Sequence, residues 1–394
     1  MLPKYYEFQN SAKILSGKFA LENIPLELKM LNAKRPLFLS DDTLNKIGTV
    51  KIVLDAIEKQ DDVVVGEQFT NIPPNSDLDL IKRIVNIYKE ANCDSIIALG
   101  GGSVIDTAKG VRMVLSQNVE DINELMGAEI LTYGKHIPFV AIPTTSGTGS
   151  EVTAVAVILD KLRQIKMEFI SYYLLPDVAV IDPRMTETLP KKIAASTGMD
   201  ALCHAIEAYT CLQKNPMSDA YAISAIKLIG ENLIDSVEKD KKEAKIAMEN
   251  ASMMAGVSFS NSMVGLVHAI GHALGGVCHV PHGNAMNILL PYCMEYNMDK
   301  IGEEYVRILL YLAGEDVYLN TKKENRGEKL VDIIEEMKER LNKLTGIPIT
   351  LKEAGVKEED LNEVAKKAIN DGAIIVNPKE ARYEDVLNIL RKAY

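Results

Sequence analysis

Two pairs of residues that could bind a metal ion stand four positions apart in helical stretches of the sequence. Asp200 and His204 lie in GMDALCHAIEAY, His268 and His272 lie in GLVHAIGHALGG, and His282 follows in HVPHG. A spacing of four places both members of a pair on one face of a helix. Neutral imidazoles and a carboxylate suit Fe(II) or Zn(II). A lone histidine on an apolar helix is usually a core residue, but this combination predicts a metal site.

The spacing alone leaves open which of these histidines bind the ion. Both members of a pair can chelate it, or one member of each pair can bind while the other transfers a proton. Cys203 and Cys278 lie near the candidates and could replace a ligand in a zinc site, but we interpret both thiols as apolar packing. The five cysteines contain no CxxC pair, so we expect reduced, buried thiols rather than a disulfide framework.

A glycine-rich turn in the first half of the chain is suited to binding phosphate. The run Gly100-Gly101-Gly102-Ser103 follows the apolar stretch SIIAL and precedes the helical pattern VIDTAKGVRMVL. Unpaired N–H groups at a helix N-terminus, together with the helix dipole, favour a pyrophosphate, and glycine lets it approach the backbone. The spacing is not the GxGxxG fingerprint of dinucleotide-binding folds, and a tight turn without a ligand is the alternative.

A second loop of the same kind, PTTSGTGSE, runs from Pro143 to Glu151 after another apolar strand. Two loops rich in hydrogen-bond donors at strand ends predict one extended ligand with several phosphate and ribose oxygens, and a dinucleotide is the natural candidate. Asp41 follows the stretch PLFLS. Its carboxylate could accept hydrogen bonds from an adenosine ribose and would repel a 2′-phosphate, or it could simply cap the helix that follows.

Strands and helices must alternate to position these loops. Short β-rich runs occupy residues 36–39, 63–65, 95–99, 139–142 and 178–181, and residues 78–91 show helical spacing. Such alternation is typical of βαβ units in a parallel sheet, and the continuous apolar runs indicate strands covered on both faces. We therefore predict an α/β dinucleotide-binding domain over residues 1–184.

The β signature fades after this point, and helical patterns follow one another. We expect helices at residues 199–211, 218–237, 242–259, 262–274, 303–313, 327–344, 357–371 and 383–393, with a break at Gly275-Gly276. The second domain, residues 185–394, is therefore predicted to be all-helical and to carry the metal and the catalytic site.

The composition is that of an ordinary globular protein. The 394 residues are 47% hydrophobic and 25% charged, with a formal net charge of −11. An acidic balance argues against nucleic-acid binding, because phosphate neutralisation needs clustered Lys and Arg. The sequence contains no charge-free apolar run of about 18 residues, so it predicts no membrane span. The N-terminus lacks the apolar core of a signal peptide. We therefore expect a cytoplasmic protein.

Four motifs in this order resemble the iron-dependent, group III, alcohol dehydrogenases: GGGSVIDTAKG, PTTSGTGSEVT, GMDALCHAIEAY and GLVHAIGHALGGVCHVPHG. That family includes lactaldehyde reductase, 1,3-propanediol dehydrogenase and bacterial butanol dehydrogenases, and the likeness covers essentially the whole chain. The resemblance implies an α/β domain with a parallel dinucleotide-binding sheet, then an all-α domain, with metal and cofactor in the cleft between them. It also implies iron with zinc as the alternative, NAD or NADP, a small alcohol or aldehyde as substrate, and a homo-oligomer.

The resemblance can be carried over residue by residue. It implies that Asp200, His204, His268 and His282 bind the metal, and that His272 lies beside the ion as a catalytic proton relay. Positions that match the family's cofactor contacts are Asp41, Asn75, Gly101, Gly102, Ser103, Asp106, Thr144, Thr145, Ser146, Thr148, Val157, Lys166 and Leu189. Asn75 stands in Pro74-Asn75-Ser76, where the family often has PNP.

A metal and a hydride carrier together imply the interconversion of an alcohol and a carbonyl, with the metal as Lewis acid. Phe259, Met263, Val264 and Val157 indicate an apolar site, although the same pattern fits core residues. We expect NAD(H) to react with short-chain primary alcohols or aldehydes. The alternatives are a glycerol-dehydrogenase-like zinc polyol dehydrogenase and a dehydroquinate-synthase-like lyase. The lyase would need clustered Lys and Arg for its anionic substrate, which ALCHAIEAY and LVHAIGHAL do not offer. A non-enzymatic nucleotide-binding protein would not need the metal residues.

Overall fold

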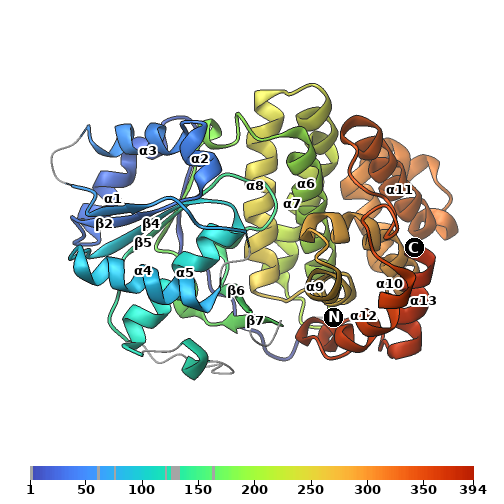
Figure 1. Cartoon of the computed structure of the whole chain (residues 1–394). Helices are drawn as coiled ribbons and strands as arrows, with labels where there is room; N and C mark the ends of the chain where they lie inside the picture. Colours follow the sequence, from blue (N-terminus) through green and yellow to red (C-terminus); the bar gives the residue numbers. More distant parts are fainter. Residues whose placement is uncertain (1–2, 60–62, 75–76, 120–121, 126–133, 162–164) are drawn as a thin grey trace. The chain divides into compact units, whose positions relative to one another are not determined.

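The chain folds into two compact units, seen in a computed structural model (Figure 1). The structure describes residues 3–59, 63–74, 77–119, 122–125, 134–161 and 165–394. The first unit contains Gln9–Thr145 and Gly149–Leu189. The second contains Met1–Phe8, Ser146–Thr148 and Pro190–Tyr394. The sequence-based domain boundary after residue 184 stays a prediction.

A parallel six-stranded sheet forms the centre of the first unit. Its strand order is β1-β8-β5-β4-β2-β3. All neighbouring strands in it run parallel. In chain order these strands are β1 (Lys13–Ser16), β2 (Pro36–Leu39), β3 (Glu67–Phe69), β4 (Ser95–Gly100), β5 (Phe139–Pro143) and β8 (Val178–Ile181). The prediction of an α/β part built on a parallel sheet is confirmed.

Helices cover both faces of this sheet, as Figure 1 shows. Successive strand residues point to opposite faces, so Ile96 belongs to one hydrophobic core and Ile97 to the other. The first core is completed by α4 (Leu78–Glu90) and α5 (Gly102–Gln117), and the second by α1 (Ile24–Met30) and α3 (Thr49–Ile57). This double burial explains the uninterrupted apolar runs of the central strands.

Several elements of the first unit differ from the prediction. The strand expected at residues 63–65 is wrong, because the strand in this segment is β3, which pairs with β2 from Glu67 onward. Val64 is 62% exposed, whereas β3 is a short, polar edge strand whose residues do not read as β-rich. The sequence analysis also missed β1 and an antiparallel hairpin formed by β6 (Val155–Asp160) and β7 (Ile165–Ile170).

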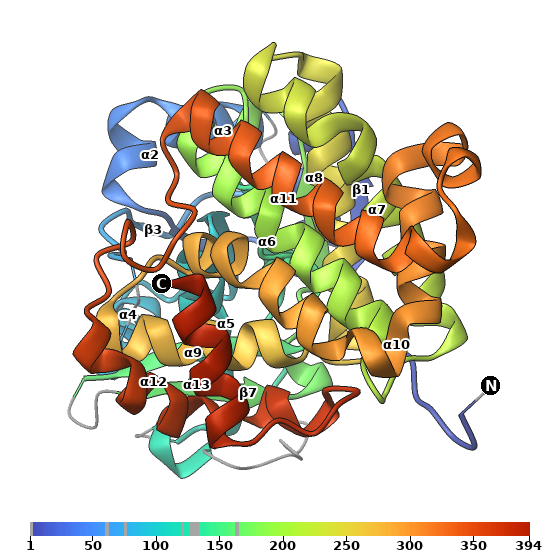
Figure 2. The ribbon, with the colours of Figure 1, turned by 90° about the vertical axis from the view of Figure 1, so that its right-hand side faces the viewer.

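The second unit is helical from residue 190 onward, which confirms the predicted helical half. Its α-helices are α6 (Lys191–Thr210), α7 (Pro216–Glu238), α8 (Lys242–Ser260), α9 (Leu266–Cys278), α10 (His282–Asn320), α11 (Arg326–Thr345), α12 (Leu361–Ala368) and α13 (Tyr383–Ala393). The helix α6 packs against α7, α8, α10 and α11 (Figure 2). Because α6 is buried without interruption from Gly198 to Thr210, its polar residues there are held away from water.

The predicted boundaries of α9 are wrong at both ends. The helix runs through Gly275-Gly276 and ends at Cys278, where His279 adopts a left-handed conformation with φ of 56°. Residues 262–265 precede the helix instead of belonging to it, and Met263 has a φ of 80°. A side chain at Gly265 would place its Cβ 3.1 Å from a carboxylate oxygen of Glu207, so this position requires a close approach of the backbone.

Two other helices of this unit also differ from the prediction. The pattern at residues 303–313 is only the middle of the longer α10, which contains non-helical residues at Ile301 and Gly314. The pattern at residues 357–371 contains only the shorter helix α12.

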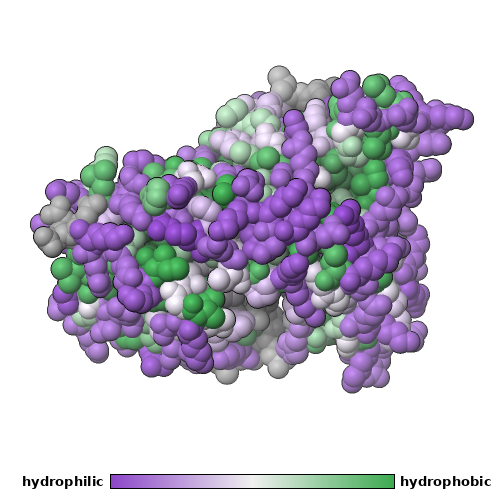
Figure 3. Space-filling view, turned by 90° about the horizontal axis from the view of Figure 1, so that it is seen from above, coloured by the Kyte–Doolittle hydropathy of each residue, from purple (hydrophilic) through white to green (hydrophobic). Residues whose placement is uncertain are grey.

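Figure 3 shows one face of the molecule, on which hydrophilic side chains predominate and hydrophobic residues are scattered among them. None of the helices in the parts of the chain that the structure describes is long and apolar enough to cross a membrane.

Candidate metal centre and cofactor loops

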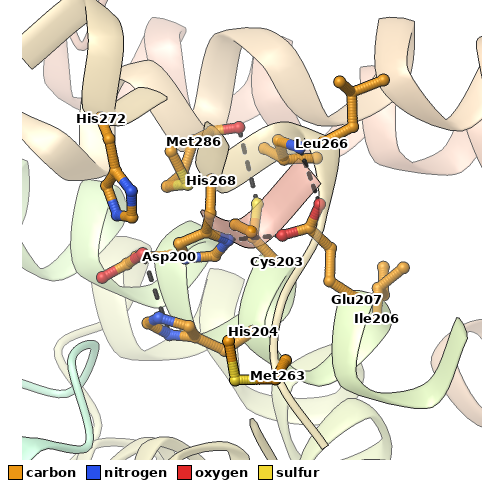
Figure 4. A network of polar contacts seen from close by, with 12 residues as sticks. Asp200, Cys203, His204, Ile206, Glu207, Met263, Leu266, His268, His272 and Met286 are labelled. Atoms are coloured by element: carbon orange, nitrogen blue, oxygen red, sulfur yellow. Dashed lines mark hydrogen bonds and ion pairs between the residues drawn. The ribbon is translucent and has the colours of Figure 1, made fainter. Parts of the chain in front are cut away.

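The four predicted metal ligands lie together in the second unit. Asp200 and His204 project from α6, His268 from α9, and His282 is the first residue of α10. One candidate ligand atom of each residue lies within 4.8 Å of those of the other three. Figure 4 shows the side chains of Asp200, His204 and His268 converging.

The distances within this group suit a single divalent ion. Asp200 Oδ1 is 3.4 Å from Nε2 of His282 and 3.8 Å from Nε2 of His268. Ligand atoms around a tetrahedral ion with bonds of about 2.1 Å stand roughly 3.4 Å apart. A hydrogen bond would bring the atoms closer than most of these contacts. The arrangement is therefore that of ligands around a common centre.

Two of these atoms are buried and lack a hydrogen-bond partner. Among the described residues, Asp200 Oδ1 and His268 Nε2 form no hydrogen bond. Both residues are only 2% exposed. A buried polar atom without a partner is costly and rare. Because a carboxylate oxygen and an imidazole nitrogen both have lone pairs to donate, a cation would satisfy both, and the residues present fit a metal ion.

Burial and charge shift the pKa values of Asp200, His204 and His268 toward the protonation states that a metal requires. Burial raises the pKa of Asp200, but the nearby His204, His282 and His268 outweigh it and hold the pKa of this carboxyl below its usual range. Burial lowers the pKa of His204 to about 3 and that of His268 well below its usual value. An ionised carboxylate beside neutral imidazoles is the ligating form of each residue.

His204 and His268 each have a ring nitrogen with a hydrogen-bond partner outside the four residues. Nδ1 of His204 donates to the backbone carbonyl of Gly147 at 3.2 Å. Nδ1 of His268 is hydrogen-bonded to the carboxylate of Glu207. For His268, such a partner on Nδ1 fixes Nε2 as the nitrogen that faces a metal. Sequence reasoning missed Glu207, although a carboxylate within the apolar stretch ALCHAIEAY was a visible signal. Burial raises its pKa to about 7.

His272 lies beside the four residues but outside their group. Its ring stacks on that of His282 with centroids 5.6 Å apart. Its Nδ1 is 3.0 Å from Asp371 Oδ2, and the other oxygen of Asp371 accepts from the backbone N–H of Ala373. Sequence reasoning missed Asp371.

The two predicted phosphate loops are neighbours at the carboxyl ends of β4 and β5. The backbone N–H of Thr144 donates to the carbonyl of Gly100 at 3.1 Å. Gly101 is the N-cap of α5 and, unlike Asp41 and Asp77 before α2 (Asp42–Lys46) and α4, supplies no side-chain hydrogen bond to the helix. The first turn of α5 therefore presents backbone N–H groups without a side-chain cap, as a bound phosphate would need.

Two residues of α5 hold the second loop and the strand after it. Asp106 accepts from Ser150 Oγ at 2.6 Å and from the backbone N–H of Val157 at 3.1 Å. One turn later, Nζ of the buried Lys109 donates to Thr153 O, Thr153 Oγ1 and Val155 O. Burial lowers the pKa of this lysine to about 8. Lys109 was also missed, although DTAKG places it three residues after Asp106 on a buried helix.

The other predicted cofactor residues are spread over the chain. Gly102 and Ser103 open α5, and Thr145 follows Thr144. Asp41 caps α2, because its Oδ1 accepts from the N–H of Leu44 at 2.9 Å. Ser146 and Thr148 belong to the second unit, and Asn75 lies outside the described residues. In the first unit, Val157 lies in β6, Lys166 lies in β7 opposite Leu159, and Leu189 ends the unit.

Comparisons with known proteins match both halves of the chain to models of the same family. The family model described as iron-containing alcohol dehydrogenase matches residues 11–183, and its C-terminal counterpart matches residues 194–394. The chain is 37% identical to an NAD-dependent methanol dehydrogenase of Bacillus methanolicus, covering 96% of this chain and 97% of that protein. It is 35% identical to an NADPH-dependent butanol dehydrogenase of Clostridium saccharobutylicum, covering 97% and 96%. An alcohol dehydrogenase structure from Oenococcus oeni superposes with a TM-score of 0.92 at 34% identity, covering 99% of this chain and 100% of that one.

Proposed function

Since this chain belongs to the iron-containing alcohol dehydrogenase family, whose members are oxidoreductases, we propose that it transfers hydride between NAD(H) and a short-chain primary alcohol or aldehyde. The observation that carries the proposal is the group Asp200, His204, His268 and His282, with two buried lone-pair atoms that lack a partner in the described structure. The hydrogen bond from Thr144 to Gly100, which joins the starts of the two glycine-rich loops, supports the dinucleotide.

The four residues of that group would hold the metal, and we propose iron, with zinc as the alternative. A divalent ion held there supplies Lewis acidity, which makes an alcohol hydroxyl more acidic and a carbonyl more electrophilic. His272 is the proposed proton relay, because its ring stacks on that of His282, one of the proposed ligands, and the carboxylate of Asp371 orients it through Nδ1. The ring of Phe259 stacks on His204 with centroids 4.3 Å apart, which supports an apolar substrate.

The preference for NAD over NADP is also a proposal. One relative is described as NAD-dependent and another as NADPH-dependent, so the family alone leaves both cofactors open. The support for NAD is Asp41, which follows the carboxyl end of β2 and would bring a negative charge close to a 2′-phosphate.

The proposed function predicts NADH oxidation by the iron-loaded protein with a short-chain aldehyde. We expect a higher kcat/KM with a short aldehyde than with dihydroxyacetone, and a higher kcat/KM with NADH than with NADPH. Absorbance at the nicotinamide band measures both ratios under anaerobic conditions. A preference for dihydroxyacetone would instead favour the polyol dehydrogenase.

Variants at Asp41 separate its charge from its role as a helix cap. Asp41→Gly is expected to bring the NADPH rate closer to the NADH rate, because the repulsive carboxylate is gone. Asp41→Asn keeps an acceptor for the N–H of Leu44 and loses only the charge, so it should have the same effect on the cofactor ratio with little loss of stability. If the wild type uses both cofactors equally, Asp41 is only a cap.

A further inference from the structure

Glu207 contacts the metal-binding helix α9 with both carboxylate oxygens. It lies on α6, three residues after His204. Its Oε2 is hydrogen-bonded to Nδ1 of His268, and its Oε1 accepts from the backbone N–H of Val267 at 2.7 Å. Figure 4 shows this carboxylate between α6 and the first turn of α9. The residue is buried, so water does not compete for these bonds.

These contacts determine how His268 is presented to a metal. An imidazole whose Nδ1 proton is held by a carboxylate keeps its lone pair on Nε2 and cannot rotate freely. In the structure, that Nε2 is the buried atom without a partner among the described residues, and it lies 3.8 Å from Asp200 Oδ1. Among the hydrogen bonds of His268 within the described residues, the one to this carboxylate selects this tautomer over the other.

We propose that Glu207 is a positioning residue for the metal, because it holds His268 in the tautomer and orientation that binds the ion. The inference rests on the proposed metal-dependent function and adds a residue to it. The competing interpretation is that Glu207 only stabilises the N-terminus of α9, where the N–H groups of the first turn need acceptors.

The chain offers a matched control for that interpretation. Asn377 Oδ1 accepts from the backbone N–H of Leu266 at 3.3 Å, the residue next to Val267. Asn377 also pairs with the side chain of Asn297. It therefore holds the same helix N-terminus as Glu207, but its side-chain hydrogen bonds go to Leu266, Asn297 and Lys379 and not to His268.

The test compares Glu207→Gln with Asn377→Ala in the full-length protein stripped of metal. Glutamine has the shape of glutamate but a single acceptor oxygen, so it cannot accept from both Val267 and His268. The affinity for Co(II) is measured by competition with a chromophoric chelator, and the visible Co(II) spectrum reports the coordination. Thermal unfolding of the metal-free protein reports the structural contribution.

We expect Glu207→Gln to weaken Co(II) binding by about 10- to 100-fold, the usual effect of losing a hydrogen bond to a ligating histidine. The Co(II) spectrum should also change. Asn377→Ala should lower the unfolding temperature of the metal-free protein and leave Co(II) affinity unchanged. Unchanged affinity in Glu207→Gln, or equal loss of affinity in both variants, would overturn the proposal.

Two further measurements keep the outcome unambiguous. If Glu207→Gln does not fold, Glu207→Asp is judged by the same criteria, because it keeps the charge and withdraws the oxygens by one methylene. If the wild type binds no stoichiometric Co(II), the metal centre itself fails. Normal binding by the wild type and unchanged binding by Glu207→Gln would reject only the role of Glu207.

Discussion

His268→Ala is expected to remove the metal ion and to lower kcat/KM by about a thousandfold or more, because the Lewis acid supplies several kcal/mol of charge stabilisation. His268 is buried between Asp200 and Glu207, and its Nε2 has no other partner among the described residues. In His268→Ala, Asp200 and His204 on α6 and His282 on α10 remain as proposed ligands, but α9 no longer supplies one. Elemental analysis and initial rates on the same sample measure the two effects.

A histidine outside the group serves as the control for this variant. His279 ends α9 in a left-handed conformation, which asparagine tolerates well. His279→Asn should therefore keep both metal and activity. Retention of a stoichiometric ion by His268→Ala, with activity close to that of the wild type, would show that His268 is not a ligand.

His272→Ala is expected to retain the metal and to lose about 10²- to 10⁴-fold in kcat, the range of a positioned general acid or base. The ring of His272 lies outside the group of ligand atoms, so its removal takes no ligand away. Metal analysis of the purified variant and the full dependence of the rate on substrate concentration separate turnover from binding.

Asp371→Asn tests how His272 is held. The asparagine oxygen can still accept from Nδ1 of His272 or from the N–H of Ala373, but it carries no charge to stabilise a protonated ring. We expect a smaller loss in kcat than for His272→Ala.

For the His272→Ala variant itself, loss of the metal ion would show that the proposed ligand set is wrong.

The parts of the fold that sequence predicts best are those in which burial is uniform along an element. The strands β2, β4, β5 and β8 are buried on both faces, and each reads as an apolar run. The edge strand β3 has exposed polar residues, and its hydrogen bonds to β2 come from tertiary pairing that local composition does not encode. The glycines Gly275 and Gly276 do not interrupt α9, which packs against α10 and α12 and ends at the left-handed His279.

Local spacing also limits what could be predicted of the site. The i,i+4 spacing places Asp200 beside His204 because both lie on one helix. The partners that orient the histidines come from distant segments. Glu207 lies 61 residues from His268, and Asp371 lies 99 residues from His272, so no spacing rule relates them. For Asp41 the sequence pattern is ambiguous, because it fits both a helix cap and a ribose contact. The structure shows the cap.

Removal of the metal by a chelator, followed by separate addition of Fe(II) and Zn(II), tests the metal dependence of the reaction most directly. NADH oxidation with a short-chain aldehyde is followed anaerobically, with elemental analysis at each stage. The proposed site predicts that the stripped protein is inactive and that Fe(II) restores turnover. Full activity in protein shown to be free of metal would contradict a catalytic role for the group Asp200, His204, His268 and His282.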